Sequence, residues 1–163
     1  MRWRIGAWIA CAGVMAVVLA GSQGTALAAP FGLVDDSELE CLALNIYFES
    51  RSEPTEGQVA VAFTTLNRVA DAKFPDTVCD VVFQGGEEMR GRCQFSWWCD
   101  GKSDRVRERK AWRDSIRIAQ LAMQKRIGDP TDGALFFHHE RVNPNWSHHF
   151  ELIAKIGKHL FYR

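Results

Sequence analysis

The segment Leu39–Phe48 most constrains what this chain can fold into. Eight of its ten residues are apolar, and at about 100° per residue they fall on every side of a helix. A helix that is apolar all round is buried in the centre of a domain. Two capping spacings, which start at Asp35 and at Ser37 with a glutamate three residues later, are typical of a helix N-terminus. The sequence therefore predicts one central helix that begins near residues 35–37.

Glu49 directly follows this apolar segment, and the helical period places it on one narrow stripe with Glu38 and Asn45. Apolar surroundings disfavour the charged form of a carboxyl group and raise its pKa, and glycosidases use this effect to keep a general acid protonated. The sequence equally allows a surface carboxylate at a fraying helix end, paired with Arg51. Composition alone leaves both interpretations open.

The first 28 residues have the features of a secretory signal peptide. Arg2 and Arg4 precede an uncharged apolar run, and Ala26-Leu27-Ala28 supplies the small residues for cleavage after Ala28. An uncleaved membrane anchor is the alternative, but the run is short for a membrane-spanning helix. We predict a cleaved signal peptide over residues 1–28 and no stable membrane span afterwards. The protein is then exported, to the periplasm or to the extracellular space and cell wall.

The charge balance argues against a nucleic-acid partner. The chain has 20 basic and 20 acidic side chains, and removal of residues 1–28 takes away Arg2 and Arg4 but no acid. The mature chain would carry 18 basic against 20 acidic side chains, a net charge of about −2. Domains that bind nucleic acids normally present a basic surface instead.

Four cysteines remain after removal of the signal peptide, and an even number in an exported protein indicates disulfides. Of the three possible pairings we predict Cys93–Cys99, which closes a short loop, together with Cys41–Cys79, which ties the central helix to a later segment. A zinc site is the alternative, but the cysteine spacing contains no C-x-x-C pair.

Two histidine pairs, His138-His139 and His148-His149, raise the question of a metal. Adjacent residues in a strand point to opposite faces, so each pair offers at most one ligand to a given point, and the sequence has no H-E-x-x-H motif. We predict no metal site and no cofactor; a hydrolase that binds a metal through His138 or His148 is the alternative. Trp146, which lies between the pairs, is expected to pack a small β element against the helical core.

The remaining pattern predicts a mainly α fold with a minor β part, in the α+β class. A long loop is expected from Gly85 to Gly101, and long loops without secondary structure are usually functional. The expected elements are a helix from Thr55 to Ala72, a short helix from Val78 to Phe83 capped by Thr77, the longest helix from Asp104 to Ile127 between Ser103 as cap and Gly128, and strands at Ala134–His138 and His159–Tyr162.

The long loop carries Gln94-Phe95-Ser96-Trp97-Trp98. This mixture favours sugar binding, because sugar faces stack on indole rings while amides bond hydroxyl and N-acetyl groups. We expect one of the two tryptophans in the core and the other exposed. Glu53 is a second carboxylate, which could act as a base, orient Arg51, or be structural or solvated.

Three motifs follow one another in a fixed order: Tyr47-Phe48-Glu49-Ser50-Arg51-Ser52-Glu53-Pro54, then Leu66-Asn67-Arg68-Val69, and finally Ile156-Gly157-Lys158-His159-Leu160-Phe161-Tyr162. In this order the chain resembles the SleB-type cell wall hydrolases, from about residue 38 to the C-terminus. Residues 29–37 are then a short N-terminal tail, and residues 38–163 are the catalytic domain. Further matching segments are Gly57–Ala62, Phe74–Val78, Gln94–Ser96, Asp100-Gly101, Gly133-Ala134, Phe137-His138 and Pro144–Trp146.

The resemblance implies a helical domain similar to lysozymes and lytic transglycosylases, with a small β element near the C-terminus. The family's catalytic glutamate, in the motif Tyr-x-Glu-Ala-Arg-Gly-Glu, corresponds to Glu49, and the motif's second glutamate corresponds to Glu53. Ser50 and Ser52 replace the alanine and the glycine of that motif.

From the resemblance we expect an exported enzyme that cleaves the bond between N-acetylmuramic acid and N-acetylglucosamine in peptidoglycan. Glu49 would protonate the leaving oxygen. The attacking group would be the sugar's own C6 hydroxyl, as in a lytic transglycosylase, or water, as in a muramidase. A non-catalytic peptidoglycan-binding module is a further alternative. We expect a monomeric enzyme that binds glycan strands. The expected catalytic residue is Glu49. The expected substrate-binding residues are Tyr47, Glu53, Gln94, Phe95, Ser96 and Trp97.

Overall fold

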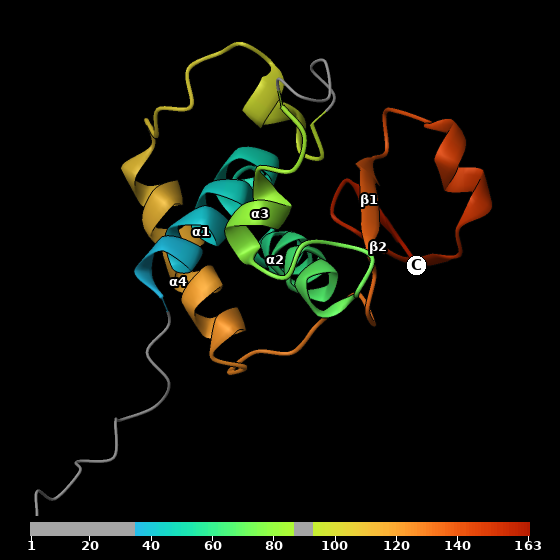
Figure 1. Cartoon of the computed structure of the whole chain (residues 1–163), viewed down its shortest axis with the longest axis horizontal. Helices are drawn as coiled ribbons and strands as arrows, with labels where there is room; N and C mark the ends of the chain where they lie inside the picture. Colours follow the sequence, from blue (N-terminus) through green and yellow to red (C-terminus); the bar gives the residue numbers. More distant parts are fainter. Residues whose placement is uncertain (1–34, 87–92) are drawn as a thin grey trace, which may run out of the picture. The chain divides into compact units, whose positions relative to one another are not determined.

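The computed structural model describes residues 35–86 and 93–163 (Figure 1). The predicted signal peptide over residues 1–28, and most of the tail that follows it, lie outside the described residues. In chain order the helices and strands are α1 (Asp36–Ser50), α2 (Thr55–Ala70), α3 (Val78–Val82), the 3-10 helix Ser96–Cys99, α4 (Arg109–Met123), β1 (Phe136–His139), the 3-10 helix Asn145–His149, β2 (Leu152–Ile156) and β3 (His159–Tyr162).

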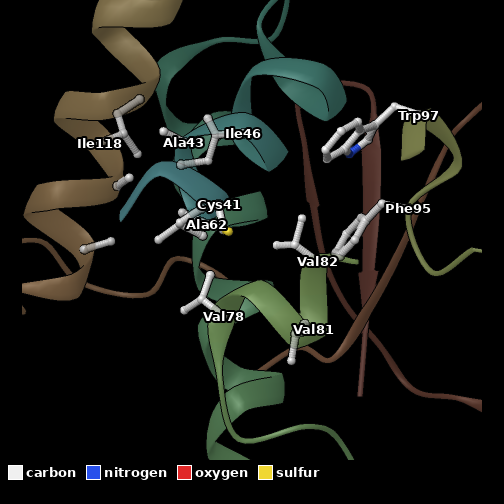
Figure 2. Close-up of a cluster of buried hydrophobic side chains, with 13 residues drawn as sticks. Cys41, Ala43, Ile46, Ala62, Val78, Val81, Val82, Phe95, Trp97 and Ile118 are labelled. Carbon is white, nitrogen blue, oxygen red and sulfur yellow. The ribbon is translucent and has the colours of Figure 1, made fainter. Parts of the chain in front are cut away.

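Helix α1 is the central helix of the domain, as its all-round apolar sequence predicted. It contacts α2, α3 and α4, which surround it (Figure 1). Leu42, Ala43 and Ile46 are completely buried. Figure 2 shows that the surrounding helices and the loop after α3 complete this core with apolar side chains. They include Ala62, Val78, Val81, Val82, Phe95, Trp97 and Ile118.

Of the two capping spacings in the sequence, the one that starts at Asp35 forms the N-cap of α1. The Asp35 carboxylate accepts a hydrogen bond from the Ser37 backbone N–H at 2.9 Å, so Asp35 is the N-cap. Glu38 has a different role, because its carboxylate accepts a hydrogen bond from the Val78 N–H at the start of α3. Helices α1 and α3 are thus joined at their N-terminal ends.

Helices α2 and α3 lie close to their predicted positions. Helix α2 ends at Ala70, two residues early, because Asp71 adopts an extended conformation and its carboxylate accepts a hydrogen bond from the Lys73 N–H. Helix α3 is capped by Thr77, whose hydroxyl accepts a hydrogen bond from the Asp80 N–H.

The predicted start of the last helix was wrong by five residues. Helix α4 begins at Arg109 rather than Asp104, and Ser103 does not cap it. The Tyr47 hydroxyl accepts hydrogen bonds from the N–H groups of Arg107 and Glu108 at 3.2 and 3.1 Å. These two amides are therefore bound to α1 through a side chain, and the segment before Arg109 stays outside the helix.

The predicted end of α4 was also wrong, and α4 is not the longest helix, since α2 has 16 residues and α4 has 15. Lys125 takes the left-handed conformation with φ 54°. Its N–H donates to the Ala122 carbonyl, and the Arg126 N–H donates to the Leu121 carbonyl, both at 2.9 Å. This is the Schellman arrangement, usually closed by glycine, and it ends the helix before Gly128 is reached.

The C-terminal part forms a three-stranded antiparallel sheet in the order β1-β3-β2. Both predicted strands are present, with β1 displaced by up to two residues, and Phe137 pairs with Phe161 while His139 pairs with His159. Strand β2 was missed by the sequence analysis. It is an edge strand with an irregularity between Leu152 and Ala154, so its side chains do not alternate cleanly.

Trp146 differs from its prediction. Its ring packs on aromatic side chains of the sheet region, with centroid separations of 5.8 Å to Phe136, 6.2 Å to Phe150 and 5.6 Å to Tyr162. It therefore covers the sheet with the segment between β1 and β2, and does not pack against the helical core.

Both predicted disulfides are confirmed: Cys41 is bonded to Cys79, and Cys93 to Cys99. The first joins α1 to α3, and the second closes the short loop that contains the 3-10 helix Ser96–Cys99. Among the helices of the described residues, none has the length and apolar character needed to cross a membrane.

Candidate active site

Glu49 lies in the last turn of α1 and is partly buried. Its side chain lines a cavity of about 300 Å³ between the end of α1, the loop after Cys93, and the sheet. The other residues that line this cavity are Cys93, Gln94, Phe95, Ser96, Phe137, His138, His139, Val142 and His159.

The carboxyl group of Glu49 is held in a form that suits an acid. Burial raises the pKa of Glu49 to about 7, and the nearby Arg68 cation partly opposes this rise. Within the described residues the two groups make no direct ion pair. A substantial fraction of Glu49 is therefore protonated at neutral pH. The alternative of a surface pair with Arg51 is wrong, because the Arg51 guanidinium binds Glu108 at 2.9 Å.

Arg68, on α2, is a buried cation that the sequence analysis did not single out. Its Nε donates to the Leu135 carbonyl at 2.6 Å, and its guanidinium lies 5.3 Å from the ring centroid of Phe74 and 5.2 Å from that of Phe95. Burial lowers the pKa of Arg68 to about 10, against the opposing effect of Glu49, so Arg68 stays charged at neutral pH. The sequence did contain a signal for this buried cation, namely an arginine among the apolar residues of a helix.

Gln94 connects the loop to this cation. With its amide oxygen turned toward α2, Gln94 accepts hydrogen bonds from both terminal nitrogens of Arg68 at 3.0 Å. Gln94 and Ser96 are exposed at the cavity, whereas Phe95 is buried beneath them. The structure thus brings these three predicted residues together with Glu49.

Trp97 and Tyr47 do not line this cavity. Trp97 is buried and donates from Nε1 to the Asn45 Oδ1 at 3.0 Å, and Asn45 in turn donates to the Thr65 hydroxyl at 3.0 Å. Tyr47 is buried and binds the backbone before α4. Both rings border a separate hollow of about 390 Å³. Trp98 is exposed, which confirms the prediction of one buried and one exposed tryptophan.

Glu53 also lies outside the lining of the Glu49 cavity. It is buried, and its Oε2 accepts a hydrogen bond from the Lys158 N–H at 2.9 Å. Its carboxylate therefore supports the turn between β2 and β3. The structure gives Glu53 a structural partner and leaves Glu49 as the carboxylate at the cavity among the described residues.

Three histidines of the sheet, His138, His139 and His159, line the cavity and were not predicted to do so. His138 is held by a 2.9 Å contact between its Nε2 and the Tyr162 hydroxyl. The antiparallel pairing of β1 with β3 is what places His139 beside His159, and sequence spacing does not reveal that pairing. In the part of the chain that the structure describes, no three His, Cys, Asp or Glu side chains are grouped to hold a metal ion.

Two larger hollows are lined by residues of the sheet region, and one of them shares lining residues with the Glu49 cavity. A hollow of about 480 Å³ shares Gln94, Phe137, His138 and Val142 with the cavity and extends to Trp146 and Phe150. A further hollow of about 640 Å³ shares Phe136 and Phe150 with the second and reaches Lys73 and Arg163. Neighbouring hollows share lining residues, and we call the three hollows together the sheet groove.

Comparison with known proteins identifies similar chains. The sequence model of a family described as cell wall hydrolases matches residues 52–162. Spore cortex-lytic enzymes are similar: that of Oceanobacillus iheyensis is 35% identical over 128 residues, which are 77% of this chain and 41% of the relative. That of Bacillus subtilis is 30% identical over 133 residues, which are 80% of this chain and 39% of the relative. The chain spans about two-fifths of the length of these curated relatives.

Two solved structures share the fold. The catalytic domain of the germination-specific lytic transglycosylase SleB from Bacillus anthracis has a TM-score of 0.62 at 31% identity, covering 80% of this chain and 97% of that domain. The catalytic domain of the Bacillus cereus SleB protein has a TM-score of 0.59 at 30% identity, covering 88% of this chain and all of that domain. These likenesses confirm the predicted mainly α fold with its small β element.

Proposed function

The chain belongs to the cell wall hydrolase family, and from this membership we propose that it cleaves the glycosidic bond between N-acetylmuramic acid and N-acetylglucosamine in peptidoglycan, with Glu49 as general acid and base. The observation that carries this proposal is the Glu49 carboxyl group itself. It lines a cavity, and its pKa is raised to about 7 by burial. An acid that protonates a leaving oxygen at neutral pH needs such a pKa.

In the proposed reaction, the protonated Glu49 donates its proton to the glycosidic oxygen as the bond from that oxygen to C1 of N-acetylmuramic acid breaks. The N-acetylglucosamine unit leaves with a new hydroxyl group. The Glu49 carboxylate then takes the proton of the C6 hydroxyl while that oxygen bonds to C1, which forms a 1,6-anhydro end and restores the acid.

The number of carboxylates favours this intramolecular route. Most hydrolysing glycosidases use two carboxyl groups, placed about 5–10 Å apart across the scissile bond. Among the described residues that line the cavity, Glu49 is the one carboxylate, while Glu53 supports the β2–β3 turn. Attack by the substrate's own hydroxyl needs no second carboxylate as nucleophile. We therefore propose a lytic transglycosylase, with hydrolysis by water as the alternative.

The sheet groove supports a polymeric substrate. The Glu49 cavity, about 300 Å³, lies at the lower end of the range of roughly 300–1,000 Å³ for ligand pockets. The other hollows of the groove are lined by aromatic side chains that include Phe136, Trp146 and Phe150. A glycan strand that is cleaved at Glu49 could continue along the groove.

The experiment that tests this function is peptidoglycan digestion by the wild type and by Glu49→Gln. The wild type is expected to release soluble fragments from purified sacculi, and Glu49→Gln is expected to release none while retaining its fold by circular dichroism. Turnover by Glu49→Gln equal to that of the wild type would contradict the role of Glu49. Binding of sacculi by both proteins without any product would instead support a non-catalytic binding module.

Mass spectrometry of the fragments distinguishes the two chemical routes. A 1,6-anhydro end is lighter than a reducing end by one water molecule, because the C6 oxygen has replaced water as the attacking group. Anhydro ends as the sole products would support the transglycosylase, and reducing ends would support a muramidase.

We also propose that the enzyme acts outside the cytoplasm as a monomer. Two disulfides within one domain are typical of exported proteins, since the cytosol keeps thiols reduced. The family description, which names the cell wall, agrees with this location. A fusion of residues 1–28 to a reporter that is active only after export tests the signal peptide, and size-exclusion chromatography with light scattering tests the monomer.

A further inference from the structure

The turn between β2 and β3 packs directly on the buried Glu53 carboxylate. Besides the hydrogen bond from the Lys158 N–H, Glu53 Oε2 lies so close to Gly157 that a Cβ atom at this position would collide with it. The same Cβ atom would lie 3.3 Å from Cδ of Pro54. Gly157 also has φ +58°, which favours glycine. Glu53 therefore fixes the position of this turn relative to the end of α1.

His159 is the first residue of β3 and follows this turn immediately. Only 4% of its surface is exposed. Its ring meets that of Phe137 edge-on, with centroids 5.3 Å apart, and lies 5.5 Å from the ring of His139. It lines the same cavity as Glu49. The turn held by Glu53 thus leads directly to an imidazole at the candidate active site.

The surroundings of His159 favour the neutral form of its imidazole. Burial lowers the pKa of His159, the nearby Glu53 carboxylate acts in the opposite direction, and His139 and His138 add to the lowering. Glu49 lines the same cavity and is itself only partly ionised near pH 7. A neutral imidazole carries one N–H donor and one acceptor nitrogen.

Neither ring nitrogen of His159 has a hydrogen-bond partner among the described residues, and one of the two is also buried. This is Nδ1, which is enclosed by protein. Buried N–H groups without an acceptor are rarer than buried acceptors without a donor, so Nδ1 is best assigned as the nitrogen without a proton. The proton is then on Nε2, which is left as the donor for a ligand in the cavity.

We propose that His159 is a substrate-contacting residue whose Nε2–H donates a hydrogen bond to a sugar oxygen in the Glu49 cavity, and that Glu53 is the positioning residue that holds it there through the Gly157-Lys158 turn. This inference rests on the proposed function. Sugar hydroxyl and N-acetyl groups supply the required acceptor oxygens. The second glutamate of the motif thereby has a role in the reaction that does not require it to be a second catalytic carboxylate.

Substitution of His159 by phenylalanine tests the contact. Phenylalanine has a similar ring and suits the aromatic neighbours Phe137 and Phe161, so the melting temperature should stay close to that of the wild type. The value of kcat/KM on solubilised glycan strands should fall by about ten- to hundredfold. His148→Phe is the matched control, because His148 is exposed and does not line the cavity. Full activity of His159→Phe would overturn the inference.

A double-mutant cycle tests the positioning role of Glu53. If Glu53 acts through His159, Glu53→Ala in the His159→Phe background should lower kcat/KM no further than His159→Phe does alone. Losses that multiply would contradict that role. Should Glu53→Ala fail to fold, Glu53→Gln replaces it, since the glutamine amide keeps an oxygen for the Lys158 N–H; the measured pKa of His159 should then fall, because a neighbouring negative charge has been removed.

Nitrogen-15 NMR of the histidine rings gives a result that does not depend on turnover. The free protein should show the Nε2–H tautomer at His159. In the Glu49→Gln protein, a tetrasaccharide of alternating N-acetylglucosamine and N-acetylmuramic acid should shift the His159 ring signals but not those of His148. The Nδ1–H tautomer or an unshifted His159 would overturn the inference. Failure of the proposed function appears separately, as a wild type that releases no product.

Discussion

Glu49 shows how one side chain can be both a liability for folding and the basis of a reaction. The carboxyl group stays partly buried at the end of a helix that the core requires, and Arg68 compensates only part of the desolvation. The same burial that disfavours its ionised form keeps it protonated near pH 7. The burial of Glu49 should therefore affect both the activity and the stability of the protein.

The activity should depend on the protonation of Glu49. With a pKa of about 7, the acid form is complete well below pH 7 and decreases about tenfold for each pH unit above it. We expect kcat/KM on solubilised glycan strands to decline above about pH 7. Initial rates between pH 4 and 9 in a constant-ionic-strength buffer measure this decline. A decline that begins near pH 4.5, the ordinary value for glutamate, would contradict it.

Glu49→Gln should abolish activity, but it should increase the stability of the fold at neutral and higher pH. The pKa of Glu49 is higher in the folded protein than in the unfolded chain, so the folded state binds the proton more tightly. Folding therefore loses stability as pH rises from about 4.5 to about 7, and the loss is complete above that window. The neutral glutamine avoids this loss, which is about 3 kcal/mol at most.

Urea denaturation of both proteins at pH 5 and pH 8 measures this difference. Glu49→Gln should be more stable than the wild type at pH 8, and by a smaller margin at pH 5. An equal difference in stability between the two proteins at both pH values would show that Glu49 titrates normally. Glu56→Gln is the matched control, because Glu56 lies at the exposed start of α2.

At the scale of elements, the two disulfides have different positions and should have different effects. Cys41–Cys79 closes a loop with a sequence separation of 38, and Cys93–Cys99 closes one with a separation of 6. The chain-entropy relation gives stabilisations of about 4 and about 2 kcal/mol. The short loop, however, carries Gln94, Phe95 and Ser96 at the Glu49 cavity. Stability and activity should therefore rank the two disulfides in opposite orders.

Two double variants test this ranking. Cys41→Ser with Cys79→Ser should lower the free energy of unfolding more, whereas Cys93→Ser with Cys99→Ser should raise KM more. Urea denaturation and steady-state kinetics on glycan strands provide the two values. If loss of the Cys41–Cys79 disulfide caused both the larger loss of stability and the larger rise in KM, the Cys93–Cys99 disulfide would have no separate role at the cavity.

The elements also show what the sequence could predict. The central helix, the short capped helix and both disulfides followed from local patterns: an all-apolar stretch, Thr77 before an apolar run, and an even number of cysteines. The ends of α4 did not. They depend on the hydroxyl of Tyr47, distant in sequence, and on Lys125 in a conformation that usually indicates glycine.

The sequence predicted only those parts of the candidate site that come from short local motifs. Glu49, Gln94, Phe95 and Ser96 do meet at one cavity, but Tyr47 and Trp97 are directed into contacts with other elements. The wall that contains His138, His139 and His159 depends on strand pairing between β1 and β3. Arg68 was missed because most of its partners, the Leu135 carbonyl and the rings of Phe95 and Phe136, come from distant parts of the chain.

In the molecule as a whole, the sheet groove consists of the Glu49 cavity and two further hollows that are lined by residues of the sheet region. Its aromatic part is built by Trp146, in the segment between β1 and β2, with Phe136 and Phe150. Its far end carries the cations Lys73 and Arg163. Such a surface should matter for long glycan strands and not for fragments that occupy the Glu49 cavity alone.

Trp146→Ala should therefore raise KM for long glycan strands by about tenfold, since an aromatic contact with a sugar face contributes on the order of 1 kcal/mol or more. For a tetrasaccharide, kcat/KM should remain near the wild-type value. Trp98→Ala is the matched control, because Trp98 is 42% exposed and lines none of the three hollows of the groove. Equal losses on long and short substrates would indicate that Trp146 acts through the fold of the sheet, and an unchanged KM on long strands would remove it from the substrate path.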